Sequence, residues 1–163
     1  MKGEPKSIST AEHRGRLQRI AEISSKLGFV GRVEYCHAYS QSGGGAQYCI
    51  GPSEDDDIMI LYAEAFERDA NPEDFPLEAM VAHECGHQRL HRDPKFREMM
   101  VRFPGEDFEE ILASLVGCVL LGDGVPAQLL LCRAVAELGD RRISGKEAFS
   151  LAERLIRVME QLV

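Results

Sequence analysis

Two histidines four residues apart constrain this chain more than any other feature of its sequence. They are His83 and His87, in the segment VAHECGHQRLH. The pattern around them predicts a helix that begins after a cap at Asp74 and ends near Arg92, where an Asp-Pro pair follows. Residues four positions apart lie on the same face of a helix, about one turn from each other. Both imidazoles are therefore expected on one face of this helix.

The two imidazoles can bind one metal ion, and the residue between them indicates zinc. Imidazole nitrogens bind Zn²⁺ at about 2.0–2.1 Å. Glu84 is rotated from His83 by about 100° around the helix axis, so it can reach a water on the metal without being a ligand. Zinc lowers the pKa of such a water to about 7, and Glu84 can then take its proton. This His-Glu-x-x-His spacing is typical of zinc peptidases and predicts Glu84 as the catalytic residue. Two histidines on a solvated helix face are the simpler alternative.

A catalytic zinc site needs a third protein ligand and an open fourth position. The predicted helix of residues 106–121 carries Glu110, which stands at helical spacing from small residues that let two helices approach closely. We therefore predict Glu110 as the third ligand. Glu109 on the same helix is the second candidate. His91 remains a further alternative, although it reaches the metal only if its helix bends.

The remaining pattern predicts an α+β fold. Short apolar stretches separated by polar loops favour a small antiparallel sheet of about three strands, at residues 29–38, 46–50 and 58–62. Apolar residues at helical spacing predict further helices at residues 10–27, 94–102, 106–121 and 126–138. A last helix is expected after Ser144, which forms an S-x-x-E capping box with Glu147.

No linker or repeat interrupts the chain, so we expect a single domain of residues 1–163. Its predicted parts are an N-terminal helix (1–28), a small sheet (29–66), the zinc-site helices (74–121) and C-terminal helices (126–163). Several side chains could stabilise a developing negative charge, judged by residue type alone: Tyr35, His37, Tyr48 and Tyr62. The acidic run of residues 54–57 is expected to form a solvated loop.

Charge and composition exclude several classes of partner. The 19 basic and 27 acidic residues give a net charge of −8, which disfavours direct binding of nucleic acid. The longest apolar run, residues 111–121, is too short to cross a bilayer, so no membrane partner is expected. The N-terminus lacks the apolar stretch of a signal peptide, and five cysteines without a CxxC pair do not suggest disulfides. These features favour a cytoplasmic protein.

Two segments carry a resemblance to a known family. His83-Glu84-Cys85-Gly86-His87, followed by Leu90-His91, resembles the HELGHxxLH segment of the ImmA/IrrE-type zinc metallopeptidases. The helix from Glu110 to Leu121 resembles the family's downstream helix, which carries the third zinc ligand, and Glu110 falls on its acidic position. The similarity covers roughly residues 58–126. Cys85 stands where the family usually has Leu, and Leu112 stands at its second acidic position.

The resemblance implies a zincin-like, gluzincin-type hydrolase. It implies a regulatory metalloprotease that cuts a repressor-like protein, with a helix-turn-helix repressor as the candidate partner. The expected function is thus a zinc-dependent endopeptidase in which His83, His87 and Glu110 bind Zn²⁺ and Glu84 acts on water. Two alternatives stay open. One is a non-catalytic, zinc-containing binding module, and the other is a different HExxH peptidase class that acts near DNA.

Overall fold

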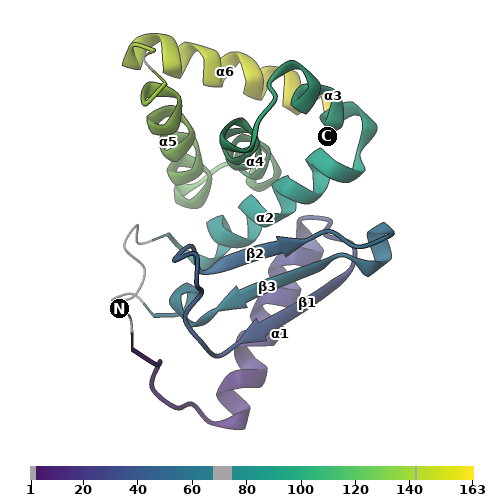
Figure 1. The fold of residues 1–163 in the computed structure, drawn as a ribbon, viewed down its shortest axis with the longest axis vertical. Coiled ribbons are helices and arrows are strands. Elements are labelled where there is room, and N and C mark those ends of the chain that lie inside the picture. The colour runs from purple at the N-terminus through teal and green to yellow at the C-terminus, as the bar shows by residue number, and fades with distance from the viewer. Residues whose placement is uncertain (1–2, 68–74, 142) are drawn as a thin grey trace.

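The chain has an α+β fold, with a small sheet at one end of the molecule and a group of helices at the other (Figure 1). The computed structural model describes residues 3–67, 75–141 and 143–163. The elements in chain order are α1 (Thr10–Lys26), β1 (Arg32–Cys36), β2 (Ala46–Cys49), β3 (Ile58–Tyr62), α2 (Leu77–Arg92), α3 (Pro94–Arg102), α4 (Glu106–Leu121), α5 (Val125–Gly139) and α6 (Gly145–Leu162), with short 3-10 turns at Glu54–Asp56 and Ala63–Ala65.

The sheet has three strands, as predicted, but it is mixed and not antiparallel. Its order is β1-β3-β2, in which β1 pairs with β3 in parallel and β2 pairs with β3 in antiparallel. The antiparallel prediction was wrong because it joined neighbours in the sequence as hairpins. Instead β3, the most apolar of the three strands, inserts between the other two, where both of its edges are paired. This order leaves β2 at one edge of the sheet.

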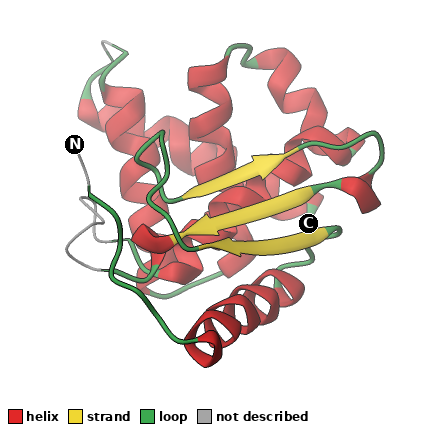
Figure 2. Cartoon of the chain, turned by 60° about the horizontal axis from the view of Figure 1, so that its bottom comes forward, coloured by secondary structure: helices red, strands yellow, loops and turns green. Residues whose placement is uncertain are grey.

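One face of the sheet packs against two helices. Alternate residues of β3, Met59 and Leu61, are fully buried, and Tyr35 of β1 is nearly so. They belong to one apolar cluster with Ile20 of α1 and Val81 of α2. Figure 2 shows α1 running along one side of the three strands. The sheet therefore fixes the position of α2, the helix that carries both histidines.

The helical part of the molecule has its own buried core around α4. Its members include Phe96 of α3, Leu112 and Leu115 of α4, Leu138 of α5 and Met159 of α6. Figure 1 shows α4 enclosed by α2, α5 and α6. Because α4 lies against α2 on one side and in this core on the other, packing holds it beside the two histidines.

Small residues bring α2 and α4 into close contact, as the sequence predicted. A Cβ atom at Gly86 would collide with the backbone carbonyl of Ala113, and one at Gly117 would lie 2.8 Å from the carbonyl oxygen of Ala82. Neither glycine could carry a side chain unless the helices moved apart. This contact allows a short carboxylate on α4 to reach the histidines.

The predicted helix boundaries agree with the structure to within a few residues. The helix of the histidines begins at Leu77 and ends at Arg92. Its predicted cap, Asp74, lies outside the described residues. Ser144 does cap α6, since its hydroxyl accepts a hydrogen bond of 3.2 Å from the Glu147 amide. All five cysteines are free in the structure.

Asp57 corrects the expectation of a solvated acidic loop. Its side chain is fully buried, and it accepts hydrogen bonds from Arg92 (2.7 and 3.0 Å), Tyr48 (2.6 Å) and Gln88 (3.0 Å). Burial by itself would raise the pKa of Asp57, but these donors outweigh it and hold the pKa well below its usual range. Asp57 thus ties the start of β3 to the last turns of α2.

We expect Asp57→Asn to lower the melting temperature by roughly 4–8 °C at neutral pH, because an amide cannot balance the Arg92 charge. The folded-state pKa of Asp57 lies below the unfolded value of about 3.9, so its stabilisation is present at neutral pH. It is lost as the pH falls through that value towards the folded pKa. Melting curves between pH 7 and pH 3 should therefore fall less steeply for the variant. Asp56→Asn, on the exposed neighbour, should match the wild type, and equal slopes for Asp57→Asn would contradict this role.

Candidate metal centre

The two histidines of α2 face α4 and are nearly buried. His83 is 6% exposed and His87 is 8% exposed. Their Nε2 atoms lie 3.2 Å apart, and the two rings are nearly perpendicular, at 86°. The predicted arrangement of two imidazoles on one helix face is therefore present, with one nitrogen of each ring directed at a common point.

Glu110 of α4 completes the group. One carboxylate oxygen lies 2.9 Å from His83 Nε2, and the other lies 3.2 Å from His87 Nε2. Ligand atoms around a tetrahedral zinc ion lie about 3.3–3.4 Å apart when the bonds are about 2.0–2.1 Å long. Small side-chain rotations would increase the observed distances between the ligand atoms to that value. His83, His87 and Glu110 could thus hold a metal ion, and imidazole and carboxylate donors suit zinc.

The outward nitrogen of each imidazole also has a partner. His83 Nδ1 lies 2.9 Å from the Ser114 hydroxyl, and His87 Nδ1 lies 2.7 Å from the Glu109 carboxylate. When each Nδ1–H donates to its partner, the Nε2 lone pairs are left to face the common point. Such outer partners fix the tautomer and orientation of histidines that bind metals.

The two other predicted candidates for the third ligand form a separate pair. One Glu109 oxygen accepts from His87 Nδ1, and the other lies 3.0 Å from His91 Nε2. Glu109 and His91 thus lie on the outer side of the His87 ring, away from the point where Nε2 and Glu110 meet. Of the two neighbouring glutamates, Glu110 reaches the common point, and Glu109 supports a histidine from behind.

The charges of the group favour a cation. Hydrogen bonds from His83 and His87 hold the pKa of Glu110 well below its usual range, and the His87 contact lowers the pKa of Glu109. Burial disfavours the charged form of His87, yet hydrogen bonds to Glu109 and Glu110 raise its pKa to about 10. The two carboxylates thus favour positive charge at this point, and a bound divalent ion would supply that charge.

Glu84 lies beside this group without belonging to it. Its side chain is 7% exposed, and burial raises the pKa of its carboxyl. It lines the same cleft as the histidines and Glu110, a hollow of about 420 Å³. We call this hollow the metal-site cleft. Its walls come from the loop before β2, from the edge strand β2 and from three helices: Ser42, Gly44, Ala46, Gln47, Tyr48, His83, Glu84, His87, Glu109, Glu110 and Arg133.

Of the side chains proposed by type to stabilise negative charge, Tyr48 is the one that lines this cleft. Its ring stacks on His87 at 6.5 Å and 7°, but its hydroxyl donates to Asp57. The Tyr35 hydroxyl contacts Arg16 and His37, and the Tyr62 hydroxyl donates to Gln47. The tyrosine hydroxyls are therefore already engaged, and Tyr48 acts on the site through its ring.

Three features of the site were not found from the sequence. Ser114 was noted as a small residue and not as a hydrogen-bond partner of His83. The stacking of Tyr48 on His87 and the position of Arg133 in the cleft depend on contacts between distant segments. A signal existed for Ser114 alone, because a residue four positions after Glu110 lies on the same face of α4.

We expect Glu109→Ala to weaken zinc binding by about 10- to 100-fold, because His87 loses the carboxylate that orients it. Competition with a zinc-binding dye would measure this at constant pH. Glu106→Ala provides the matched control, since Glu106 lies in the same first turn of α4 and is exposed. Zinc affinity unchanged in Glu109→Ala would show that the contact does not support the site.

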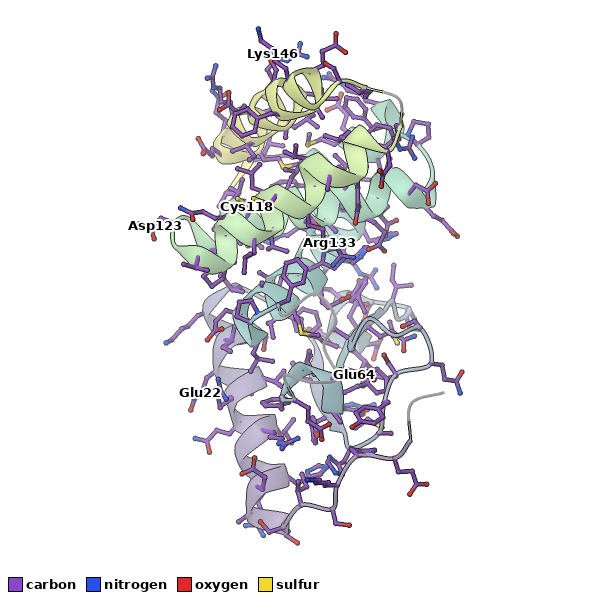
Figure 3. All side chains as sticks on the ribbon, turned by 90° about the vertical axis from the view of Figure 1, so that its left-hand side faces the viewer. Glu22, Glu64, Cys118, Asp123, Arg133 and Lys146 are labelled. Atoms are coloured by element: carbon purple, nitrogen blue, oxygen red, sulfur yellow. The ribbon has the colours of Figure 1, made fainter. Side chains whose placement is uncertain are left out.

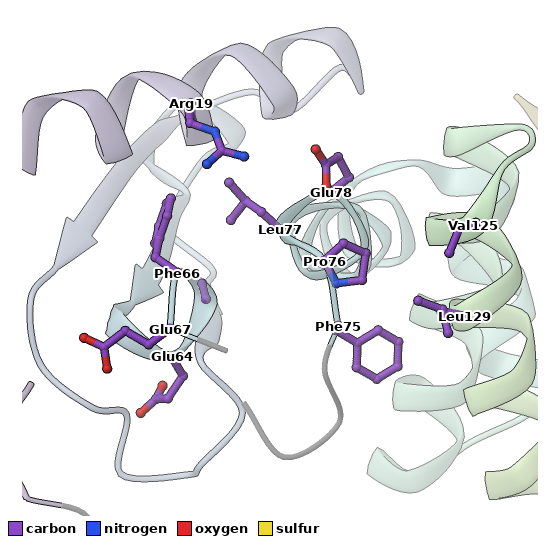
Figure 4. A pocket seen from close by; sticks show the side chains of 11 residues that line it. Arg19, Glu64, Phe66, Glu67, Phe75, Pro76, Leu77, Glu78, Val125 and Leu129 are labelled. Atoms are coloured by element: carbon purple, nitrogen blue, oxygen red, sulfur yellow. The ribbon is translucent and has the colours of Figure 1, made fainter. Parts of the chain in front are cut away.

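Some of the other hollows lie away from this centre. One of about 530 Å³ is formed between α1, the segment after β3, and the starts of α2 and α5 (Figure 4). Its lining residues include Arg19, Phe66 and Leu129, and none of them belongs to the metal centre. Within the described ranges, every helix is too short or too polar to span a bilayer.

No protein-family model, no curated protein and no solved structure matches this chain.

Proposed function

We propose that this chain is a zinc-dependent peptidase that hydrolyses peptide bonds with water. The observation that carries the proposal is the meeting of His83, His87 and Glu110 at one point, with Glu84 beside them in an open cleft. A structural zinc site needs four protein ligands and no such glutamate, whereas a catalytic one has three ligands and an open position. The resemblance to ImmA/IrrE-type metallopeptidases supports the same conclusion, as does the zincin-like class that it implies.

In the proposed hydrolysis, the zinc ion and Glu84 would have separate roles. When bound by His83, His87 and Glu110, zinc would act as a Lewis acid towards the peptide carbonyl and would lower the pKa of a water to about 7. Glu84 takes a proton from the attacking water as its oxygen bonds to the carbonyl carbon. The carboxyl then gives this proton to the leaving nitrogen as the C–N bond breaks. The products are a carboxylic acid and an amine, and Glu84 returns to its starting form.

The edge strand β2 provides a place for the substrate chain. One edge of β2 pairs with β3, and its residues Ala46, Gln47 and Tyr48 line the metal-site cleft. An extended peptide can add to a free sheet edge through backbone hydrogen bonds. We therefore propose an extended protein segment as the substrate. The family resemblance points to a repressor-like protein as its source.

Two measurements on the purified chain test this function. Metal analysis should find about one zinc per chain, removable by a chelator and restored by added zinc. Quenched fluorescent peptides with randomised central residues should be cleaved by the zinc-loaded protein and not by the chelated one. Absence of zinc binding would refute the proposal. Stoichiometric zinc without cleavage of any peptide or candidate repressor would refute its catalytic part and favour a binding module.

A further inference from the structure

Glu64 is a buried carboxylate that the proposed chemistry does not use. It lies in the short turn that follows β3, and its side chain is 2% exposed. Figure 3 shows it in the half of the molecule that contains the sheet. Among the described residues, the other buried carboxylates are Asp57, which pairs with Arg92, and Glu84 beside the metal centre. Burial of a carboxylate is costly unless hydrogen bonds compensate for it, so the contacts of Glu64 indicate its role.

Both carboxylate oxygens of Glu64 bind Ser40. One accepts a hydrogen bond of 2.5 Å from the Ser40 amide, and the other accepts one of 3.0 Å from the Ser40 hydroxyl. The same hydroxyl accepts a hydrogen bond of 2.9 Å from the Gly45 amide. These bonds join the two ends of residues 40–45, which we call the cleft turn. Glu64 also borders the hollow beside α1 (Figure 4), but both of its oxygens are engaged by Ser40.

The base of the cleft turn is fixed against the sheet and against α2. The Gly45 carbonyl accepts a hydrogen bond of 2.9 Å from the Tyr62 amide at the end of β3. Gly45 has a φ of +75°, and a Cβ atom there would lie 2.6 Å from the end of the Met80 side chain. Met80 lies on α2, one turn before His83. Glu64 therefore helps to set where the cleft turn stands relative to the helix of the histidines.

The tip of the cleft turn reaches the metal-site cleft. Ser42 and Gly44 are exposed, and both line this cleft together with the histidines. The turn continues directly into β2, whose residues line the same cleft. Because glycine has no side chain, its backbone can come close to a bound chain. A peptide that lies along the edge of β2 would therefore meet the backbone of the turn and the hydroxyl of Ser42.

We propose that the cleft turn binds the substrate chain and that Glu64 is the positioning residue that holds the turn in place. This inference rests on the proposed peptidase function. The contacts of the turn are made to the intact peptide and persist as it reacts, so they contribute to binding more than to the chemical step. Glu64 acts through Ser40 and Gly45 and does not itself touch the substrate.

The first test removes the bonds at the base of the turn and uses the best cleaved fluorescent peptide. Ser40→Ala and Glu64→Ala should each raise KM by about tenfold, with kcat changed by less than about threefold and zinc content unchanged. Glu64→Gln should largely restore the wild-type KM, because its amide can accept from the Ser40 amide and donate to the Ser40 hydroxyl. Ser53→Ala is the matched control, since Ser53 also donates to a carboxylate but lies in an exposed loop outside the cleft.

The second test places a side chain at the tip of the turn. A Cβ atom at Gly44 would meet only the Ser42 hydroxyl, at an ordinary 3.8 Å, so Gly44→Leu should fold as the wild type does. Its side chain should narrow the cleft and raise KM by about tenfold. Gly15→Leu, on the exposed face of α1, is the control and should leave KM unchanged. Peptide binding to Glu84→Gln protein gives the same comparison without turnover: adding Ser40→Ala should raise the Kd by about tenfold.

Several outcomes would overturn the inference. One is a wild-type KM in both Ser40→Ala and Gly44→Leu. Another is a loss confined to kcat, which would assign the turn to the chemical step. Loss of zinc from Ser40→Ala would show that these bonds support α2 and not the substrate. Failure of the proposed function would appear in the wild type, which would cleave no peptide, whereas failure of this inference would appear only in the variants.

Discussion

Glu84→Gln is expected to lower peptide hydrolysis by about 10³-fold while leaving zinc binding and folding intact. Glutamine has the same shape as glutamate but cannot accept a proton from water, and proton transfer by a positioned group contributes about 10²–10⁴-fold. Zinc content should stay at the wild-type level, because Glu84 is not one of the three residues that meet at the common point. The loss should fall on kcat, with a small change in KM.

Glu78→Gln gives the matched control for this variant. Glu78 lies on the same helix, in its first turn, and lines the hollow beside α1 and not the metal-site cleft. The same chemical change there should leave both activity and zinc content unchanged. Hydrolysis above about one tenth of the wild-type rate in Glu84→Gln would show that another group handles the proton. Loss of zinc from that variant would show that Glu84 is a ligand.

Removal of a ligand is expected to have the second large effect. Both His87→Ala and Glu110→Ala should weaken zinc binding by about 10³-fold, more than the 10- to 100-fold typical of outer partners. Each variant leaves only two donors at the common point. Competition titrations with a zinc-binding dye would give the affinities, and the metal content after dialysis would give an independent check.

Comparison among the variants decides between the three candidates for the third ligand. Glu110→Ala should lose far more affinity than Glu109→Ala, because Glu110 lies 2.9 Å from His83 Nε2 whereas Glu109 contacts the outer nitrogen of His87. His91→Ala should change the affinity by less than about threefold, since His91 contacts Glu109 and no other member of the group. An effect of Glu109→Ala equal to that of Glu110→Ala would contradict the proposed ligand set.

Much of the local structure could be predicted from the residues because it depends on near neighbours. The helix of His83 and His87 follows from apolar residues at helical spacing and from the Asp-Pro pair after Arg92. The cap at Ser144 depends on a residue three positions away. The strand order could not be predicted in this way, because the pairing of β1 with β3 joins residues 26 positions apart, as in Arg32 with Ile58.

Burial was the second limit on prediction from sequence. Asp57 follows three other acidic residues, and that pattern is typical of a solvated loop. In the folded chain it lies under Arg92 and Tyr48, which come from α2 and β2. A carboxylate tolerates burial when such partners surround it. The residues next to Asp57 in the sequence do not indicate that these partners will be present.

The sequence by itself determined the pair of imidazoles and the glutamate between them. Their relative positions follow from the pitch of one helix, which is the same in every protein. Only the tertiary structure decided which carboxylate joins them and which cation lines the same cleft. The side chains of Glu109 and Glu110 leave α4 in directions about 100° apart. Which of them reaches the histidines depends on how α2 and α4 cross, and the close contacts at Gly86 and Gly117 set that crossing. The position of Arg133 in the cleft likewise depends on packing between segments that are far apart in the sequence.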